Sequence, residues 1–236
     1  QKELLLDKMF IVPTAKNPLR AKEEGPTAEQ RLEMARRALP LMNQNGPDQP
    51  EIFSVESIEV DRGGTSYTIE TLKELTKTHP SADFYLIIGA DQLESFPKWK
   101  DYKSILKLAH LVVTSRPGMT LPTIKKEMPG WLAEQVKSFK NTKGTLTSGK
   151  KILFVSLNDV DVSATLIRRK IRNNENVSAF TPSVVLDYVK SANLYREVEN
   201  RIGDFKDFTQ FCVNRLEEKG GLTILAYDLT GMEQPT

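Results

Sequence analysis

The segment from Asp159 to Asn173 combines hydroxyl and guanidinium side chains at a spacing that suits phosphate binding. Ser163 and Thr165 come shortly before Arg168, which is followed by further basic residues. A helix that begins here would present unpaired N–H groups and a partial positive charge beside the hydroxyls, and together these groups could hold nucleotide phosphates. The alternative is a solvated basic helix with Ser163 as its N-cap, and these residues alone do not exclude it.

A second stretch, IIGADQLESFPKW, carries polar and aromatic residues directly after an apolar run. Gly89 would let the chain turn there, and Asp91 would either cap the next helix or accept hydrogen bonds from ribose hydroxyls. Trp99 follows in a polar loop, where its ring could stack on a base or a pyridine with about 1 to 3 kcal/mol. The alternative role for Trp99 is to close the edge of the core.

Two further stretches offer groups that bind anions. In RGGTSYT the backbone N–H groups at the start of a helix could hold a phosphate or a carboxylate, with Thr68 beside them. An ordinary helix capped by Ser66 explains the same residues. Arg116 follows an apolar run and precedes a Pro-Gly turn, so its guanidinium could reach a phosphate or could be solvated.

These residues follow short apolar runs that alternate with helical patterns. The helices are predicted at 26–39, with a Thr27 and Gln30 capping box and a stop at Pro40, and at 66–79, with a stop at Pro80. Strands that are short and continuously apolar are typical of a parallel sheet covered on both faces, so the pattern predicts a doubly wound α/β fold. Ligands of such sheets bind at the carboxyl ends of the strands. The predicted strands are 9–13, 52–60, 84–89, 111–115 and 152–156.

The composition excludes several classes of protein. The 236 residues include 33 basic and 31 acidic side chains, a net charge of +2, which gives no general attraction to nucleic acid or to an anionic membrane. One cysteine and two histidines rule out an internal disulfide and disfavour a zinc site. No apolar run approaches the roughly 20 residues of a membrane span. We expect a cytoplasmic globular protein without nucleic-acid or membrane partners.

Four stretches, in order and spacing, resemble the nicotinate mononucleotide adenylyltransferases: SYTIETL, YLIIGADQLESFPKWKDYKSILKLAHLVVTSRPG, VDVSATLIRRKI and VVLDYVKSANLY. The resemblance implies a Rossmann-like nucleotidyltransferase fold. It also implies adenylyl transfer from ATP to nicotinate mononucleotide, which gives deamido-NAD and pyrophosphate in NAD biosynthesis, with Mg²⁺ accompanying ATP. Transfer to nicotinamide mononucleotide or pantetheine phosphate, and a nucleotide-binding or ribosome-associated module without catalysis, are the alternatives.

The same resemblance implies roles for individual residues. Arg168 would stabilise the reacting phosphates, and the resemblance assigns no residue to a metal. The mononucleotide would be bound by Tyr67, Thr68 and Trp99. ATP would be bound by Gly89, Asp91, Arg116, Ser163, Thr165 and Arg168.

One part of the family pattern is absent from this sequence. The first strand and the His-x-Gly-His motif after it have no counterpart, and neither His79 nor His110 occupies an equivalent position. In a 3-2-1-4-5 sheet that strand is central, between the strands that contain Met9 and Phe84. Its loss would remove roughly 6 to 12 kcal/mol of burial, close to the stability of a whole domain. We therefore expect an N-terminally truncated chain that folds poorly and does not catalyse, whereas its intact parent is active.

The C-terminal part extends beyond the family's usual length. Residues 1–198 are predicted to form the nucleotidyltransferase domain, 199–203 a linker and 204–236 a helix followed by a strand with the sequence LTILAYDL. The extension weakly resembles the start of ribosomal silencing factor domains, which implies a ribosome-related partner. The alternative is an extension that packs on the main domain. The helical spacing rests on Phe205, Phe208, Phe211, Cys212 and Leu216, with Gly220 and Gly221 as the stop.

Overall fold

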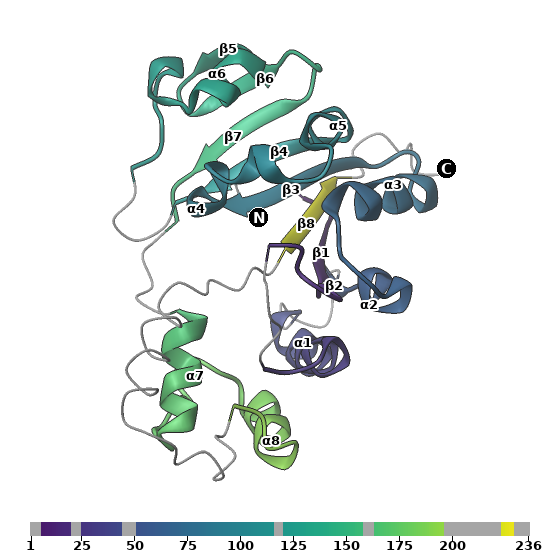
Figure 1. The fold of residues 1–236 in the computed structure, drawn as a ribbon, viewed down its shortest axis with the longest axis vertical. Helices are drawn as coiled ribbons and strands as arrows, with labels where there is room; N and C mark the ends of the chain where they lie inside the picture. The colour runs from purple at the N-terminus through teal and green to yellow at the C-terminus, as the bar shows by residue number, and fades with distance from the viewer. Residues whose placement is uncertain are drawn as a thin grey trace.

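A computed structural model describes residues 6–19, 25–43, 51–115, 120–157, 163–195 and 223–228. Its centre is an eight-stranded sheet with the order β2-β1-β8-β3-β4-β7-β6-β5 (Figure 1). The strands are β1 (Lys8–Val12), β2 (Phe53–Val55), β3 (Asp83–Gly89), β4 (Ala109–Thr114), β5 (Val136–Lys140), β6 (Lys143–Leu146), β7 (Lys151–Val155) and β8 (Thr223–Asp228).

Helices connect the strands as the alternating pattern predicts. They are α1 (Ala28–Met42), α2 (Ile58–Arg62), α3 (Thr68–Thr78), α4 (Ala90–Leu93), α5 (Tyr102–Leu108), α6 (Gly130–Gln135), α7 (Ala164–Arg172) and α8 (Ser183–Ser191). Two short 3-10 helices occupy Phe96–Lys98 and Lys125–Glu127. β1 pairs with β2, and β4 pairs with β3 and β7, all in parallel, so the predicted α/β class is confirmed. The sheet is nevertheless mixed, because β5 and β6 form an antiparallel hairpin on the outer side of β7.

The position between β1 and β3 is occupied by β8, the strand predicted in LTILAYDL. β8 is antiparallel to both neighbours, and Leu225 lies opposite Phe10 in β1 and Leu86 in β3. The expectation that β1 and β3 lack ladder partners is therefore wrong. The physical reason is that the position requires only an extended segment that offers N–H and C=O groups on both sides, whichever way the segment runs.

Two element boundaries also differ from the expectation. Pro40 lies inside α1, which continues to Met42, so it does not end the helix. A proline removes one backbone donor, and the remaining bonds, such as that from the Asn43 N–H to the Leu39 carbonyl, sustain the last turn. The strand predicted at 52–60 ends at Val55, and α2 begins at Ile58. The capping box of Thr27 and Gln30 and the end of α3 before Pro80 are confirmed.

The main core lies between the sheet and the helices α3, α5 and α6. Phe10, Phe84, Leu72, Phe96 and Leu132 are each at most 2% exposed in this cluster. A smaller cluster joins α8 to α1 and α7 below the sheet in Figure 1. The sheet and the helices α3, α5 and α6 each bury one face in the main core, which holds the strand ends and the loops after them in defined places. Within the described residues, no helix has both the length and the apolar character that crossing a membrane requires.

Candidate active site

The parallel strands β1, β3, β4 and β7 end at one edge of the sheet, and the predicted site residues follow these ends. Gly89 ends β3, and α7 with Arg168 follows β7. Tyr67 and Thr68 belong to the loop and helix that follow β2 and α2. Arg116, which follows β4, lies outside the described residues.

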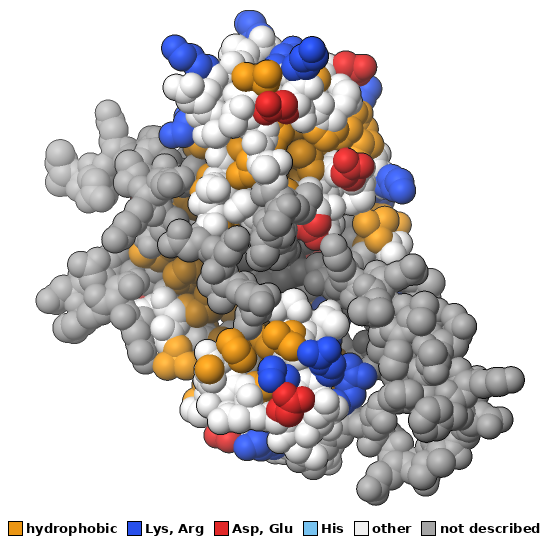
Figure 2. All heavy atoms as spheres, turned by 90° about the vertical axis from the view of Figure 1, so that its left-hand side faces the viewer, with side chains coloured by type: hydrophobic (Ala, Val, Ile, Leu, Met, Phe, Trp, Pro, Cys, Tyr) orange, Lys and Arg blue, Asp and Glu red, His pale blue; other side chains and the backbone are white. Residues whose placement is uncertain are grey.

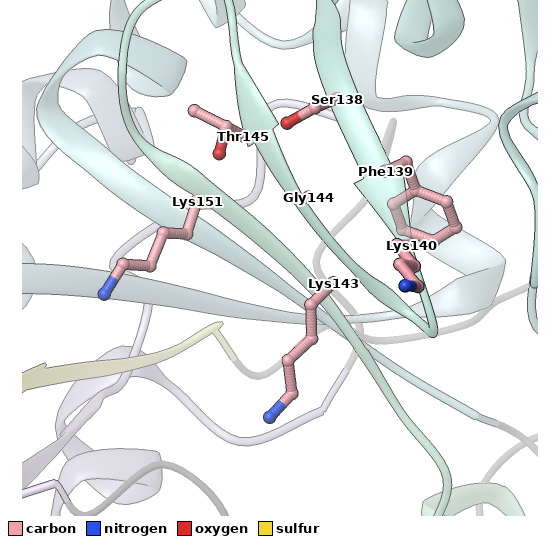
Figure 3. A pocket seen from close by; sticks show the side chains of 7 residues that line it. All are labelled: Ser138, Phe139, Lys140, Lys143, Gly144, Thr145 and Lys151. Atoms are coloured by element: carbon pink, nitrogen blue, oxygen red, sulfur yellow. The ribbon is translucent and has the colours of Figure 1, made fainter.

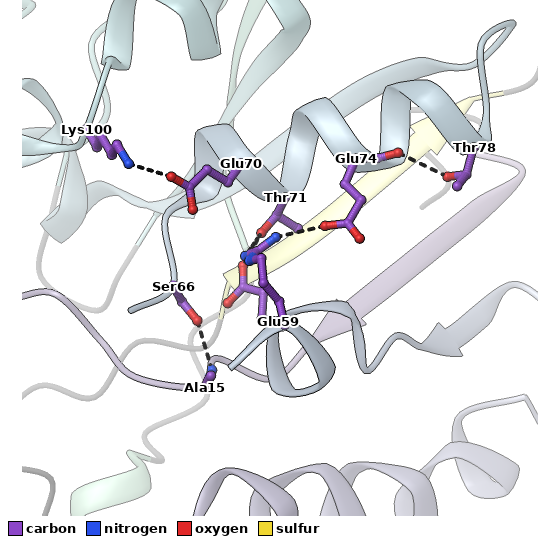
Figure 4. Close-up of polar contacts among 9 residues, drawn as sticks. Ala15, Glu59, Ser66, Glu70, Thr71, Glu74, Thr78 and Lys100 are labelled. Carbon is purple, nitrogen blue, oxygen red and sulfur yellow. Dashed lines mark hydrogen bonds and ion pairs between the residues drawn. The ribbon is translucent and has the colours of Figure 1, made fainter. Parts of the chain in front are cut away.

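Backbone and side-chain hydrogen bonds join the loop after β1 to the loop before α3 (Figure 4). The N–H of Ala15 donates to Ser66 Oγ at 2.8 Å, and the N–H of Ser66 donates to the carbonyl of Lys16 at 2.8 Å. Ser66 is 6% exposed. The prediction that Ser66 caps α3 is therefore wrong, because its hydroxyl is used between two loops and Tyr67 stands at the N-cap position.

The N-terminus of α3 has no side-chain cap, a feature that it shares with most of the described helices. Tyr67 is in extended conformation at the N-cap and its side chain makes no capping hydrogen bond. Gly63 and Gly64 have φ angles of +68° and +66°, a left-handed conformation that favours glycine, and they turn the chain from α2 into this position. The N–H groups of Glu70 and Thr71 donate to the Tyr67 carbonyl, so those of Thr68 and Ile69 are the ones that could receive an anion.

Lys100 connects the loop of Trp99 with the first turn of α3. Its ammonium lies 4.2 Å from the centre of the Tyr67 ring and forms an ion pair with Glu70. The hydrogen bond from Lys100 is the main cause that lowers the pKa of Glu70. The three residues predicted for the mononucleotide, Tyr67, Thr68 and Trp99, are thus brought to one region. Sequence reasoning missed Lys100, since a lysine in a polar loop has the pattern of a solvated residue.

The ring of Trp99 packs on the edge of the core. Its centre lies 5.0 Å from that of Phe96 with an interplanar angle of 39°, and Phe96 in turn stacks on Trp131. The indole Nε1 of Trp99 is buried and has no hydrogen-bond partner among the described residues. The core-edge role weighed for Trp99 accounts for these contacts, and stacking on a pyridine stays a prediction.

Gly89 and Asp91 lie at the end of β3 as expected, but their local roles differ. Gly89 is the N-cap of α4 with a φ of −74°, which any residue can adopt, so the turn does not require glycine. Asp91 is inside the first turn of α4, and the expected capping by Asp91 is wrong. Its Oδ2 accepts a long hydrogen bond of 3.4 Å from Gln92. The ribose contact remains a prediction.

The start of α7 has the geometry of an ordinary helix with Ser163 as its N-cap, the alternative to a phosphate site. Ser163 is the N-cap, and its Oγ accepts a hydrogen bond from the Leu166 N–H at 3.1 Å. One turn on, Arg168 donates to Thr165 Oγ1 at 3.3 Å. Lys and Arg side chains gather on the lower part of the face in Figure 2, where α7 lies. Phosphate binding by Ser163, Thr165 and Arg168 stays a prediction, because the cap and the basic surface fit both interpretations.

Arg31 in α1 ties the loop after β1 to the helices below the sheet. Its Nη1 donates to the carbonyl of Thr14 at 2.6 Å, and its Nη2 donates to the carbonyl of Ala15 at 3.0 Å. Burial raises the pKa of Tyr195, while the nearby charges of Arg168 and Arg31 act to lower it. Arg31, which binds the loop after β1, and Arg168 of α7 therefore both lie near Tyr195. Sequence reasoning missed Arg31, whose position in a helix pattern predicts solvation.

Both histidines lie away from the carboxyl edge. His79 is the C-cap of α3, and His110 is the second residue of β4. His110 is 4% exposed, its Nδ1 accepts the Lys151 N–H at 2.6 Å, and its Nε2 lies 3.3 Å from Asp83 Oδ2. β3, β4 and β7 all begin at this amino edge. His110 therefore organises the start of three strands.

The environment of His110 predicts a pH-dependent stability. Burial lowers its pKa from the ordinary 6.5, and the opposing effect of Asp83 is smaller. As the pH falls, His110 is protonated in the unfolded chain at a higher pH than in the folded chain. Its contribution to the free energy of unfolding is therefore greatest above pH 6.5 and is lost as the pH drops below that value. Urea unfolding between pH 7.5 and 5 should show this loss. His110→Asn, which keeps an acceptor for the Lys151 N–H but does not titrate there, should flatten it, and an equal slope in both proteins would contradict the assignment.

A hollow of about 340 Å³ lies on the β5–β7 extension (Figure 3). Lys140, Lys143 and Lys151 surround it, and Lys151 begins β7. The hollow is thus toward the amino end of β7, away from the predicted nucleotide residues. Among the described residues no group of three or more His, Cys, Asp or Glu side chains could hold a metal ion.

Comparison with known proteins identifies the family of this chain. A Cytidylyltransferase-like family profile matches residues 2–170. The probable nicotinate-nucleotide adenylyltransferase of Clostridium tetani is 34% identical over 196 residues, which cover 82% of this chain and 86% of the relative. The corresponding protein of Hydrogenovibrio crunogenus is 33% identical over 193 residues, which cover 82% of this chain and 85% of the relative.

A similar fold is found in a solved structure. The Plasmodium falciparum nicotinic acid mononucleotide adenylyltransferase in complex with NaAD has a TM-score of 0.55 and 14% sequence identity, with 80% of this chain and 82% of that chain covered. At this identity the likeness concerns the fold alone. From the family profile and the sequence relatives together, the chain belongs to the nicotinate-nucleotide adenylyltransferase family of cytidylyltransferase-like proteins.

Proposed function

We propose that this chain binds ATP and nicotinate mononucleotide at the carboxyl edge of its sheet and serves adenylyl transfer between them. The observation that carries the proposal is the contact of Lys100 with the Tyr67 ring and with Glu70, which brings the loop of Trp99 to the N-terminus of α3. Such a helix end suits the carboxylate of a nicotinate, and an aromatic ring nearby suits its pyridine. The names of the sequence relatives support the same substrate.

The proposed reaction is a direct in-line displacement. A phosphate oxygen of the mononucleotide forms a bond to the α-phosphorus of ATP, and the bond from that phosphorus to the bridging oxygen breaks and releases pyrophosphate. Arg168 and the hydroxyl of Thr165 would hold the ATP phosphates and stabilise the charge that moves onto the leaving group. Tyr67, Thr68 and Trp99 would hold the mononucleotide in line, and Asp91 would contact the ribose of ATP. The contribution of the protein is positioning and charge stabilisation.

Mg²⁺ belongs to the proposed reaction as the companion of ATP. When bound, it would neutralise charge on the pyrophosphate that leaves. The described residues offer no cluster of carboxylates for it, which fits an ion held chiefly by substrate phosphates, as Mg²⁺ usually is.

Direct binding is a sharper test than turnover. Both histidines of this chain lie at the amino edge of the sheet, away from the carboxyl edge where they could assist the reaction. Calorimetric titration with nicotinate mononucleotide, nicotinamide mononucleotide and ATP with Mg²⁺ should give a Kd in the range of about 1 µM to 1 mM for the nicotinate and ATP. The nicotinamide, which lacks the carboxylate, should bind at least about tenfold more weakly. Equal affinity for the two mononucleotides, or none for either, would overturn the proposed substrate. Formation of deamido-NAD and pyrophosphate should be followed in parallel.

A further inference from the structure

A buried carboxylate joins α2 to α3 beneath the candidate mononucleotide site. Glu59 is 2% exposed, and its Oε1 accepts a hydrogen bond of 2.6 Å from Thr71 Oγ1, a side chain that is fully buried. Arg62 completes the network, because its Nη2 donates to Thr71 Oγ1 at 3.0 Å and its Nη1 donates to Glu74 at 2.9 Å. Figure 4 shows Glu59, Thr71 and Glu74 where the two helices face each other. The four residues Glu59, Arg62, Thr71 and Glu74 are called the α2–α3 network below.

Stability alone does not explain why a carboxylate occupies this place. The second oxygen, Oε2 of Glu59, is buried and has no hydrogen-bond partner among the described residues. A buried acceptor without a partner lowers stability by about 1 to 3 kcal/mol, and apolar residues of similar shape often pack two helices at least as well. What a network of directional bonds adds over apolar packing is a single relative position of the two helices.

The α2–α3 network closes a loop that contains the candidate mononucleotide residues. The Gly63 N–H donates to the carbonyl of Glu59 at 3.1 Å, and the Thr71 N–H donates to the carbonyl of Tyr67 at 3.3 Å. Glu59 is thus one turn before the loop, and Thr71 is one turn after it. Between these two points the chain passes through Gly63 and Gly64, whose freedom of rotation leaves the position of α3 relative to α2 to the network and to the hydrogen bonds of Ser66.

We propose that Glu59 is a positioning residue for the mononucleotide, and that it acts through Thr71 on the first turn of α3. This inference rests on the proposed function, in which Tyr67 and Thr68 line the mononucleotide site. With the network intact, the loop is ordered before the ligand arrives. Without it, part of the binding free energy is consumed in ordering the loop, so the affinity for the mononucleotide falls. ATP, which is proposed to bind at Asp91 and α7, keeps its affinity.

Substitutions in α3 separate positioning from general stability. Thr71→Val keeps the buried volume but removes the hydroxyl between Glu59 and Arg62, whereas Thr71→Ser keeps the hydroxyl. Thr76→Val is the matched control, because Thr76 Oγ1 donates to the Leu72 carbonyl within the same helix and is outside the network. We expect Thr71→Val to raise the Kd for nicotinate mononucleotide about tenfold and to leave the Kd for ATP within about twofold. Thr71→Ser and Thr76→Val should resemble the unsubstituted chain.

Hydrogen exchange measured by mass spectrometry supplies a readout that does not depend on ligand identity. In Thr71→Val the amides of residues 63–70 should exchange about tenfold faster than in Thr76→Val, with no ligand present. If the unsubstituted chain does not bind nicotinate mononucleotide, the proposed substrate is wrong, and the exchange of residues 63–70 still decides whether the network orders the loop. An equal rise in Kd for both ligands, or unchanged exchange, overturns the positioning role.

A second substitution covers the case in which Thr71→Val does not fold. Arg62→Met removes the outer donor of the network, and the Arg62 side chain is 25% exposed, so its loss leaves the core intact. A few-fold rise in the Kd for nicotinate mononucleotide with unchanged ATP affinity supports the proposal. Unchanged affinities for both ligands, together with unchanged exchange at 63–70, overturn it.

Discussion

Leu225→Pro is expected to lower the free energy of unfolding by about 3 kcal/mol or more. Leu225 lies in the middle of β8, which pairs with β1 on one side and with β3 on the other. Proline has no N–H to donate to a ladder, and its ring is excluded from the interior of a sheet. Because a domain's total stability is about 5 to 15 kcal/mol, such a loss would remove roughly a fifth to three fifths of it.

Urea unfolding followed by circular dichroism measures this effect, with Leu225→Val as the control. Valine keeps the N–H and favours strands, so the control should stay close to the unsubstituted chain. The proline variant should also lose affinity for both substrates, since the loops after Val12 and Gly89 are carried by the neighbours of β8. An unfolding curve of Leu225→Pro that matches that of Leu225→Val would show that β8 does not hold β1 and β3 together in solution.

Arg168→Ala is expected to weaken ATP binding by about 10- to 100-fold. A hydrogen bond between a guanidinium and a phosphate contributes about 1.5 to 3 kcal/mol, and each 1.4 kcal/mol corresponds to a factor of ten. The residue lies in the middle of α7, five positions after Ser163, and the N-terminal N–H groups of the helix add to its attraction for phosphate. The affinity for nicotinate mononucleotide should change by less than about twofold, because its proposed contacts are at α3 and Trp99.

Arg169→Ala is the matched control for Arg168→Ala. Arg169 is on the same helix and carries the same charge, but it is exposed and points about 100° away around the helix axis. Isothermal titration with ATP and Mg²⁺, at two salt concentrations, distinguishes a specific contact from a general basic surface. If both variants lose the same small amount of affinity and salt removes the difference from the unsubstituted chain, Arg168 contributes only to the surface potential.

Local patterns in the sequence were enough to predict most elements of the sheet. The apolar runs at 84–89, 111–115 and 152–156 correspond closely to β3, β4 and β7. Thr27 with Gln30 marks the start of α1, and Pro80 follows the end of α3. Such signals depend on neighbours in the chain, through side-chain caps, missing N–H groups and continuous burial, so the sequence alone contains them. The family motifs, which are also local, led to the site residues and to the proposed substrate.

What required the tertiary structure is a set of contacts between distant segments. The pattern of LTILAYDL predicts a strand, but nothing local shows that it lies between β1 and β3, because backbone groups of any extended segment satisfy that position. In the sequence Ser66 has the pattern of a helix cap, whereas in the structure its Oγ accepts a hydrogen bond of 2.8 Å from the Ala15 N–H. Nothing in the sequence shows that Glu59 is buried and accepts a hydrogen bond from Thr71. Whether a polar side chain serves its own helix or a remote partner depends on packing. The sequence by itself therefore determined the elements, the class and the family motifs, and the packing of the chain decided the partner of each polar group.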